Sequence, residues 1–169
     1  MQTHGSDDLR GERGPPPAVD GFGPRAARRF SMRYLLDVNV LVAWGWADHI
    51  DHDRTAAWIA ESRGDRDTTL LTSAIPQLGF VRVSVQRMAG RLSVSEAAIT
   101  LAGMIDSLGR SHEFLADDLD RTKWPAWCRS ATRTTDAHLL SLAGVHRAKL
   151  ATLDARTLGA FLLPFFERP

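Results

Sequence analysis

The stretch LLDVNVLVA, residues 35–43, decides the fold, because it places one acid and one amide inside an almost continuous apolar run. Residues 34–38 are apolar except for Asp37, which predicts a strand buried on both faces and therefore central in a parallel sheet. An ionised Asp37 at the carboxyl end of such a strand is costly unless a partner compensates the charge. Asp37 is therefore a candidate functional residue, and a cap on a following helix is the simpler alternative.

The chain around this stretch alternates short apolar runs with amphipathic segments, which indicates an α/β protein with helices covering a parallel sheet. Beyond the first strand, we expect strands at residues 70–72, 113–116, 150–153 and, at the sheet edge, 162–166. We expect helices at residues 51–62, 73–88, 93–108 and 124–130 and from 134 or 135 onward. Ser73, and Ser93 or Ser95, are the expected caps of two of these helices.

Composition bounds the domain organisation and the compartment. The 169 residues, 44% of them hydrophobic, suffice for one globular domain. Residues 1–31 are rich in Gly and Pro and lack apolar periodicity, so we expect a disordered arm before one folded domain over 32–169.

A single cysteine excludes an internal disulfide and a Cys-based zinc site. No apolar run is long enough for a membrane span, and a reducing cytoplasm fits. The net charge of +1 confines any nucleic-acid contact to a local patch.

Three more polar side chains stand at expected element boundaries. Asp154 ends the strand at 150–153, and Asp136 lies in the first turn of a helix, on the face that turns toward the sheet. Capping and the helix dipole would explain each of these acids alone. Gln77, in SAIPQLGFVRV at residues 73–83, is the one amide. Since like ends of parallel strands meet at one crevice, we interpret Asp37, Gln77, Asp136 and Asp154 as one site.

The predicted convergence of acids has a chemical consequence. Two unit charges 4 Å apart repel by roughly 4 kcal/mol at a protein-like effective dielectric, so the cluster needs a proton or a cation. Oxygen ligands alone favour Mg²⁺ or Mn²⁺. Such an ion can bind a phosphodiester oxygen and make a water nucleophilic, which is how a metal-dependent nuclease cleaves a backbone.

Five segments together resemble a known family. LLDVNVLVA, QLGFVR (77–82), FLADDL (114–119), TTDAHLLSLA (134–143) and LATLD (150–154) are similar in order and spacing to the PIN-domain ribonucleases, and within them to VapC-type toxins of bacterial toxin–antitoxin pairs. The resemblance implies a three-layer α/β/α sandwich with a central parallel sheet, with residues 32–169 as a PIN-like nuclease domain. It also implies a Mg²⁺- or Mn²⁺-dependent endoribonuclease acting on structured RNA such as tRNA or rRNA. A VapB-type antitoxin and a homodimer are the implied partners.

The resemblance assigns roles by position. Asp37, Asp136 and Asp154 match the family's metal-binding acids, and polar neighbours that orient them match at Asn39, Thr134 or Thr135, and Thr152. Gln77 departs from the pattern, because the family usually has Glu there. A Gln supplies no charge and takes no proton, so we expect reduced catalytic activity.

Two other function classes stay open. The first is a catalytically weakened relative that keeps the fold and binds an antitoxin or RNA without efficient cleavage, which Gln77 favours. The second is a haloacid-dehalogenase-type phosphatase, in which an acid after the first strand is the nucleophile, although Asn39 stands where the second acid of its D-x-D loop would be. The cluster of His49, Asp51, His52 and Asp53 is interpreted as a solvated helix entry, and Asp117 and Asp118 as a solvated loop.

Overall fold

A central sheet of five parallel strands forms the middle of the protein. The computed structural model describes residues 31–120 and 124–165, so the predicted arm at 1–31 lies outside the described residues except for Ser31. The strands lie in the order β3-β2-β1-β4-β5. They are β1 Met32–Leu36, β2 Thr68–Ser73, β3 His112–Leu115, β4 Lys149–Thr152 and β5 Phe161–Leu162. The expected parallel sheet is confirmed, with β5 at its edge.

The middle strand is β1, and its two faces contribute to two separate cores. Leu35 is paired with Leu71 of β2 on one side and with Leu150 of β4 on the other, and all three are fully buried against α5. Leu36 and Leu70 belong to the second core, on the opposite face. From Tyr34 to Leu36 the strand is buried on both faces and has no side exposed to solvent, which is why these three residues are apolar.

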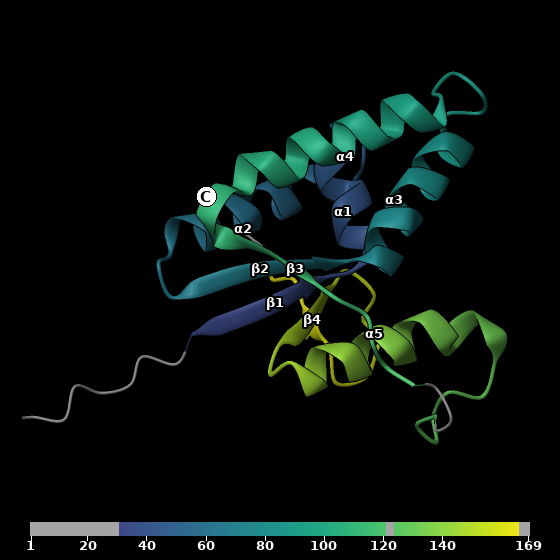
Figure 1. Ribbon diagram of the computed structural model, residues 1–169. Coiled ribbons are helices and arrows are strands. Elements are labelled where there is room, and N and C mark those ends of the chain that lie inside the picture. Colours follow the sequence, from purple (N-terminus) through teal and green to yellow (C-terminus); the bar gives the residue numbers. More distant parts are fainter. Residues whose placement is uncertain (1–30, 121–123, 166–169) are drawn as a thin grey trace, which may run out of the picture.

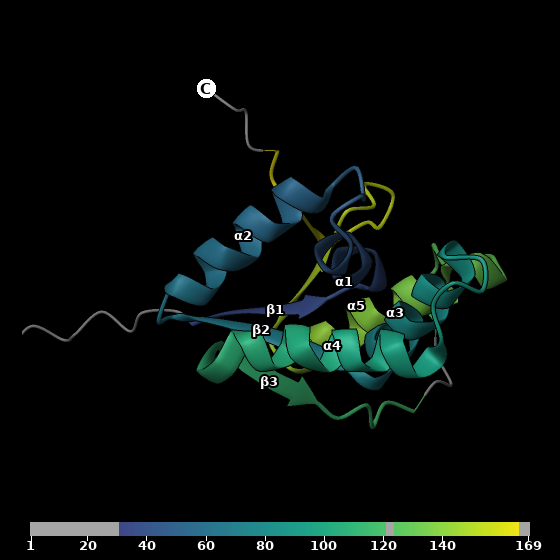
Figure 2. The same ribbon diagram turned by 90° about the horizontal axis from the view of Figure 1, so that it is seen from above.

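In the described part of the chain, α1 to α4 cover one face of the sheet and α5 covers the other (Figure 1). Their bounds are α1 Val38–Gly45, α2 His52–Gly64, α3 Ala74–Arg87, α4 Val94–Leu108 and α5 Thr134–Val145. Seen from above in Figure 2, α1 lies between α2 and the pair α3 and α4, and it contacts all three. The three layers expected from the family resemblance are therefore present. Within the described residues, no helix is long and apolar enough to cross a membrane.

Helix α1 corrects the sequence-based expectation of a strand up to residue 38. The strand ends at Leu36, and Val38 already begins a helix that was not predicted. The β-branched residues of this segment favour a strand locally. Two effects outweigh that preference: Asp37 caps the helix, and Val40 to Ala43 are buried among the other helices.

A second correction concerns residues 124–130, for which a helix was expected. In this segment the structure has turns, with the Cys128 N–H donating to the Pro125 carbonyl at 2.9 Å. A short 3₁₀ turn follows at Ala131–Arg133. Trp124 is exposed, and no residue of this segment is fully buried. Without a buried face, so short a segment cannot repay the cost of helix nucleation.

The cap predictions had mixed outcomes. Ser93 caps α4 through a full capping box, in which Glu96 N–H donates to Ser93 Oγ and Glu96 Oε2 accepts from the Ser93 N–H. Ser73 is the residue before α3 but its hydroxyl makes no capping bond. It is fully buried at the end of β2, so its position in the sheet dictates its orientation.

A glycine brings α3 close to α1 beside the predicted site. A methyl group added at Gly79 would lie 2.5 Å from Cγ2 of Val38, the first residue of α1. Only a residue without a Cβ allows this approach. The segment QLGFVR thereby helps to hold the start of α1, which follows Asp37 directly.

Candidate active site

Asp37 is held at the carboxyl end of β1 by three hydrogen bonds. Its Oδ1 accepts from the Val38 N–H at 2.7 Å, which caps α1. Its Oδ2 accepts from Asn39 Nδ2 at 2.9 Å and from the Thr152 hydroxyl at 2.7 Å. Asp37 is only 5% exposed. Burial raises the pKa of its carboxyl group, and the nearby Asp136 raises it further against the lowering effect of these donors.

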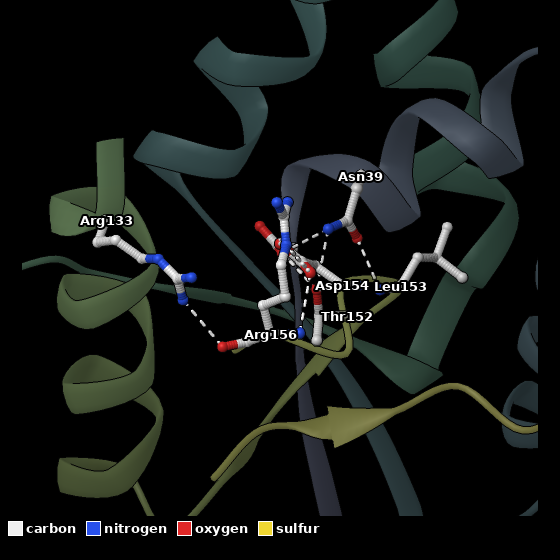
Figure 3. A network of polar contacts seen from close by, with 7 residues as sticks. Asn39, Arg133, Thr152, Leu153, Asp154 and Arg156 are labelled. Atoms are coloured by element: carbon white, nitrogen blue, oxygen red, sulfur yellow. Dashed lines mark hydrogen bonds and ion pairs between the residues drawn. The ribbon is translucent and has the colours of Figure 1, made fainter. Parts of the chain in front are cut away.

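Thr152, at the end of the neighbouring strand β4, joins the residues around Asp37. Its hydroxyl donates to Asp37 and accepts from Asn39 Nδ2 at 2.9 Å and from the Asp154 N–H at 3.1 Å. One donor and two acceptor positions are all that a hydroxyl offers. Asn39 also accepts from the Leu153 N–H at 3.0 Å. Figure 3 shows this network, which ties the ends of β1 and β4 together.

Asp154 forms an ion pair with Arg156. The guanidinium donates from Nε to Oδ1 at 2.9 Å and from Nη2 to Oδ2 at 2.9 Å. The Arg156 N–H donates to Oδ1 as well. These bonds lower the pKa of Asp154 to about 2, so it is ionised at neutral pH. Arg133, just before α5, donates to the Arg156 carbonyl at 2.9 Å.

Asp136 lies in the first turn of α5. It receives no hydrogen bond from the part of the chain that the structure describes. Desolvation raises its pKa, and the charge of Asp154 adds to that rise, while Arg133 and Arg156 lower it. Asp136 thus affects the ionisation of Asp37, and Asp154 affects that of Asp136. The structure brings these three predicted residues into one electrostatic neighbourhood, together with Asn39 and Thr152.

The donor set suits a hard divalent cation, but the present arrangement is incomplete. Asp37 and Asp136 offer carboxylate oxygens in a site where their charge is insufficiently compensated, which favours a cation. The Asp154 oxygens are occupied by Arg156. Among the described residues, no three His, Cys, Asp or Glu side chains are gathered closely enough to hold a metal.

Gln77 lies in a different hydrogen-bond network from the three acids. Its amide Nε2 donates to the Thr72 hydroxyl at 2.9 Å, and that hydroxyl contacts His112 Nε2 at 2.8 Å. Gln77 also lines a cavity between α3 and α4 with Leu101 and Phe114. The contacts of the side chain therefore run toward β2, β3 and α4. Its predicted part in the site remains a prediction.

The two predicted threonines at the start of α5 have separate surroundings. Thr134 donates to the Ala131 carbonyl at 2.8 Å, which closes the turn before the helix. Thr135 is exposed and lines an apolar cavity of about 490 Å³ with Val38 and Gly79. Neither contact reaches an acid, so their roles as polar neighbours also stay predictions.

Some residues near the site were missed in the sequence. Arg133 and Arg156 were not predicted as site residues, because an Arg close to an Asp in a loop is common and matches no motif. Asp117 was interpreted as part of a solvated loop, but its Oδ2 lies 2.6 Å from Nε2 of the nearly buried His138. Because His138 belongs to α5, this contact fastens the chain after β3 to the helix that carries Asp136.

Comparison with known proteins agrees with this architecture. Residues 34–158 match the PIN domain family. Ribonuclease VapC39 of Mycobacterium tuberculosis is 37% identical over 130 residues, which cover 73% of this chain and 90% of that protein. Ribonuclease VapC44 of the same organism is 39% identical over 132 residues, covering 73% of this chain and 87% of the relative. The order of strands, the acids at their ends and this similarity show that the chain belongs to the PIN domain family, within its VapC-type group.

Proposed function

We propose that this protein is a metal-dependent endoribonuclease toxin that hydrolyses structured RNA. The observation that carries the proposal is the electrostatic proximity of three acids: burial raises the pKa values of Asp37 and Asp136, Asp136 adds to the rise at Asp37, and Asp154 adds to the rise at Asp136. Such uncompensated charge is costly for folding alone and typical of functional sites. The names of the VapC ribonucleases support the same activity.

In this proposal Asp37 and Asp136 hold Mg²⁺ or Mn²⁺, and Asp154 joins them once it leaves Arg156. The ion would supply positive charge to the scissile phosphodiester and to the attacking water. Thr152 and Asn39 orient Asp37, since both donate to its Oδ2. Because that oxygen is engaged twice, Oδ1 is the oxygen that retains an acceptor position for the ion.

The RNA would be bound through local cations, because the whole chain has a net charge of only +1. The Arg156 side chain is 77% exposed beside the acids, and Arg133 adjoins it. Phosphate is a natural partner of such guanidinium groups. We propose a folded RNA such as tRNA or rRNA as the substrate and the cytoplasm as the compartment.

A VapB-type antitoxin and a second copy of the chain are the proposed partners. Supporting this, several large apolar side chains are exposed on and beside α3 and α4: Leu78, Val94, Ile99 and Phe114. Exposed apolar patches of this kind mark interaction surfaces. Two of these residues, Leu78 and Val94, also line the cavity beside Thr135.

A catalytically weakened PIN protein is the alternative. Gln77 favours it, because an amide stands where the family usually has a carboxylate and is engaged with Thr72. Such a protein would bind its antitoxin or RNA and cleave little.

The test is cleavage of total bacterial RNA by the purified protein, freed of any partner, in Mg²⁺ or Mn²⁺ and in EDTA. Asp37→Asn is the matched control. Discrete fragments that vanish with chelator and in the variant would support the metal-dependent ribonuclease. Intact RNA in every reaction, from protein with a native circular dichroism spectrum, would favour the weakened relative.

A further inference from the structure

Arg156 engages both oxygens of the Asp154 carboxylate through three N–H groups. Oδ1 accepts from the Arg156 backbone N–H and from Nε, each at 2.9 Å. Oδ2 accepts from Nε at 3.2 Å and from Nη2 at 2.9 Å. The single Nε–H is shared between the two oxygens, so three hydrogens engage a carboxylate that has about four lone-pair positions. A cation at Asp154 would therefore lie beside the positive guanidinium and compete with it for both oxygens.

Hydrogen bonds hold the backbone of Arg156 in place, whereas its exposed side chain can move away from Asp154. Its N–H is bonded to Asp154, and its carbonyl accepts from Arg133 Nη1 at 2.9 Å. The side chain itself is 77% exposed, and an exposed ion pair contributes little stability. A cavity of about 360 Å³, lined in part by Asn39, His49 and Leu153, adjoins both Asp154 and Arg156. A ligand can reach the guanidinium there.

We propose that Arg156 keeps Asp154 from binding metal in the free protein and releases it when its guanidinium binds a phosphate of the RNA. A phosphate offers the planar fork the same paired oxygens as a carboxylate. The exchange transfers Arg156 from Asp154 to the substrate and frees the third carboxylate of the site. This inference rests on the proposed function, because it assumes that the acids hold a divalent cation.

The exchange couples metal binding to RNA binding. If RNA removes the competitor of the metal, RNA raises the affinity for metal, and metal raises the affinity for RNA by the same factor. A site assembled in this way is complete only when substrate is present.

The experiment measures Mn²⁺ binding from the electron paramagnetic resonance signal of the free ion, with no cleavage required. Wild-type protein, Arg156→Gln, Arg156→Lys and Asp37→Asn are titrated with and without a short single-stranded phosphorothioate RNA. Arg133→Gln is the matched control, because it removes a positive charge from the same neighbourhood without freeing an oxygen of Asp154. Circular dichroism checks that each variant is folded.

Without RNA, Arg156→Gln should bind Mn²⁺ about two- to fivefold more tightly than wild type, the range that one exposed ion pair allows, and Arg133→Gln should gain less. The Mn²⁺ affinity of Arg156→Lys should lie between those of wild type and Arg156→Gln, since a lysine cannot pair with both oxygens of Asp154 as an arginine does. The oligonucleotide should strengthen Mn²⁺ binding more in wild type than in Arg156→Gln, in which only the contact between metal and RNA phosphate couples the two.

Two results would overturn the inference alone: Mn²⁺ binding that depends on Asp37 but is no tighter in Arg156→Gln than in Arg133→Gln, or equal coupling to RNA with and without Arg156. Mn²⁺ binding that is absent in every variant, or that persists in Asp37→Asn, would overturn the proposed metal site and this inference with it.

Discussion

The Thr152 hydroxyl donates a hydrogen bond to Asp37 Oδ2 across 2.7 Å, although 115 positions separate the two residues in the chain. The pairing of β1 with β4 brings them together, since the two strands run parallel and end at the same edge of the sheet. Both residues are nearly inaccessible to solvent. The orientation of the buried acid therefore depends on a residue from the far end of the domain.

Replacing Thr152 by Val should remove this donor at almost constant volume. Asp37 would keep its other two bonds, but Asn39 and the Asp154 N–H would each lose an acceptor. We expect a loss of about 1–3 kcal/mol of unfolding free energy and slower RNA cleavage. Urea denaturation measures the change in unfolding free energy. Thr152→Ser keeps the hydroxyl and should retain most of the stability, and a Ser variant as unstable as Val would show that packing, not the hydroxyl, matters.

Gly79→Ala should push α3 away from α1, because the new methyl would meet Val38 at 2.5 Å. Overpacking of this kind costs about 1–3 kcal/mol, and the displaced start of α1 should also lower the rate of RNA cleavage. Gly103→Ala is the control, since Gly103 lies in α4 with open space around it. That substitution should stabilise by about 0.5–1 kcal/mol. Equal thermal midpoints for the two variants would contradict the proposed close contact.

Metal should stabilise the protein at neutral pH. The folded-state pKa values of Asp37 and Asp136 lie above their ordinary value of 3.8. The folded state therefore binds more protons than the unfolded chain, and these acids reduce stability as the pH rises through 3.8 and the raised values. A bound cation offsets that loss, by about 2.7 kcal/mol at a hundred times its dissociation constant.

The measurement is the thermal midpoint in Mn²⁺ and in EDTA at pH 7 and at pH 4. The gain from Mn²⁺ should be largest at pH 7 and absent in Asp37→Asn. In EDTA at pH 7, Asp136→Asn should melt above wild type, because it removes the uncompensated charge. A lower midpoint for Asp136→Asn would show that the helix dipole or another contact compensates that charge.

The contribution of the Asp154–Arg156 pair to folding stability should decrease in acid, whereas Asp37 and Asp136 reduce stability as the pH rises. The folded pKa of Asp154, about 2, lies below its ordinary value of 3.8. Its contribution to stability is therefore present above pH 3.8 and is lost as the pH falls toward 2. Because the arginine is exposed and its charge is screened by solvent, that contribution should be small.

Carboxyl-carbon NMR titration measures the Asp154 pKa directly. In Arg156→Gln the pKa should return toward 3.8, and in Arg133→Gln it should move much less. An unchanged low pKa in Arg156→Gln would mean that another group holds the carboxylate ionised.

Gln77→Glu should increase RNA cleavage if the amide limits the enzyme. A carboxylate can still accept from the Thr72 hydroxyl, so the contact with β2 can persist with the donor reversed. We expect a rate increase of about ten- to a hundredfold, at or below the low end of what an acid–base group contributes. Gln77→Leu is the comparison without charge. A Glu variant no faster than the parent would remove the argument for a weakened site.

Local pattern explains why much of the fold could be predicted. The apolar run around Leu35 and Leu36 placed β1 in the middle of a parallel sheet, and Ser93 with Glu96 marked the start of α4. These signals lie within a few residues of the structure they specify. The same holds for Asp37, Asp136 and Asp154, whose positions at element ends follow from the apolar residues beside them.

Tertiary structure decided the start of α1 and the partners of the site residues. Val38, Val40 and Val42 favour a strand locally, and the Asp37 cap together with burial between helices makes them helical. The bond from Thr152 to Asp37 depends on which strand lies beside β1, and the contact of Gln77 with Thr72 depends on how α3 packs. The sequence by itself determined where the acids stand along the chain. Their orientation, and the occupation of Asp154 by Arg156, arise from contacts that exist only once the strands are ordered in space.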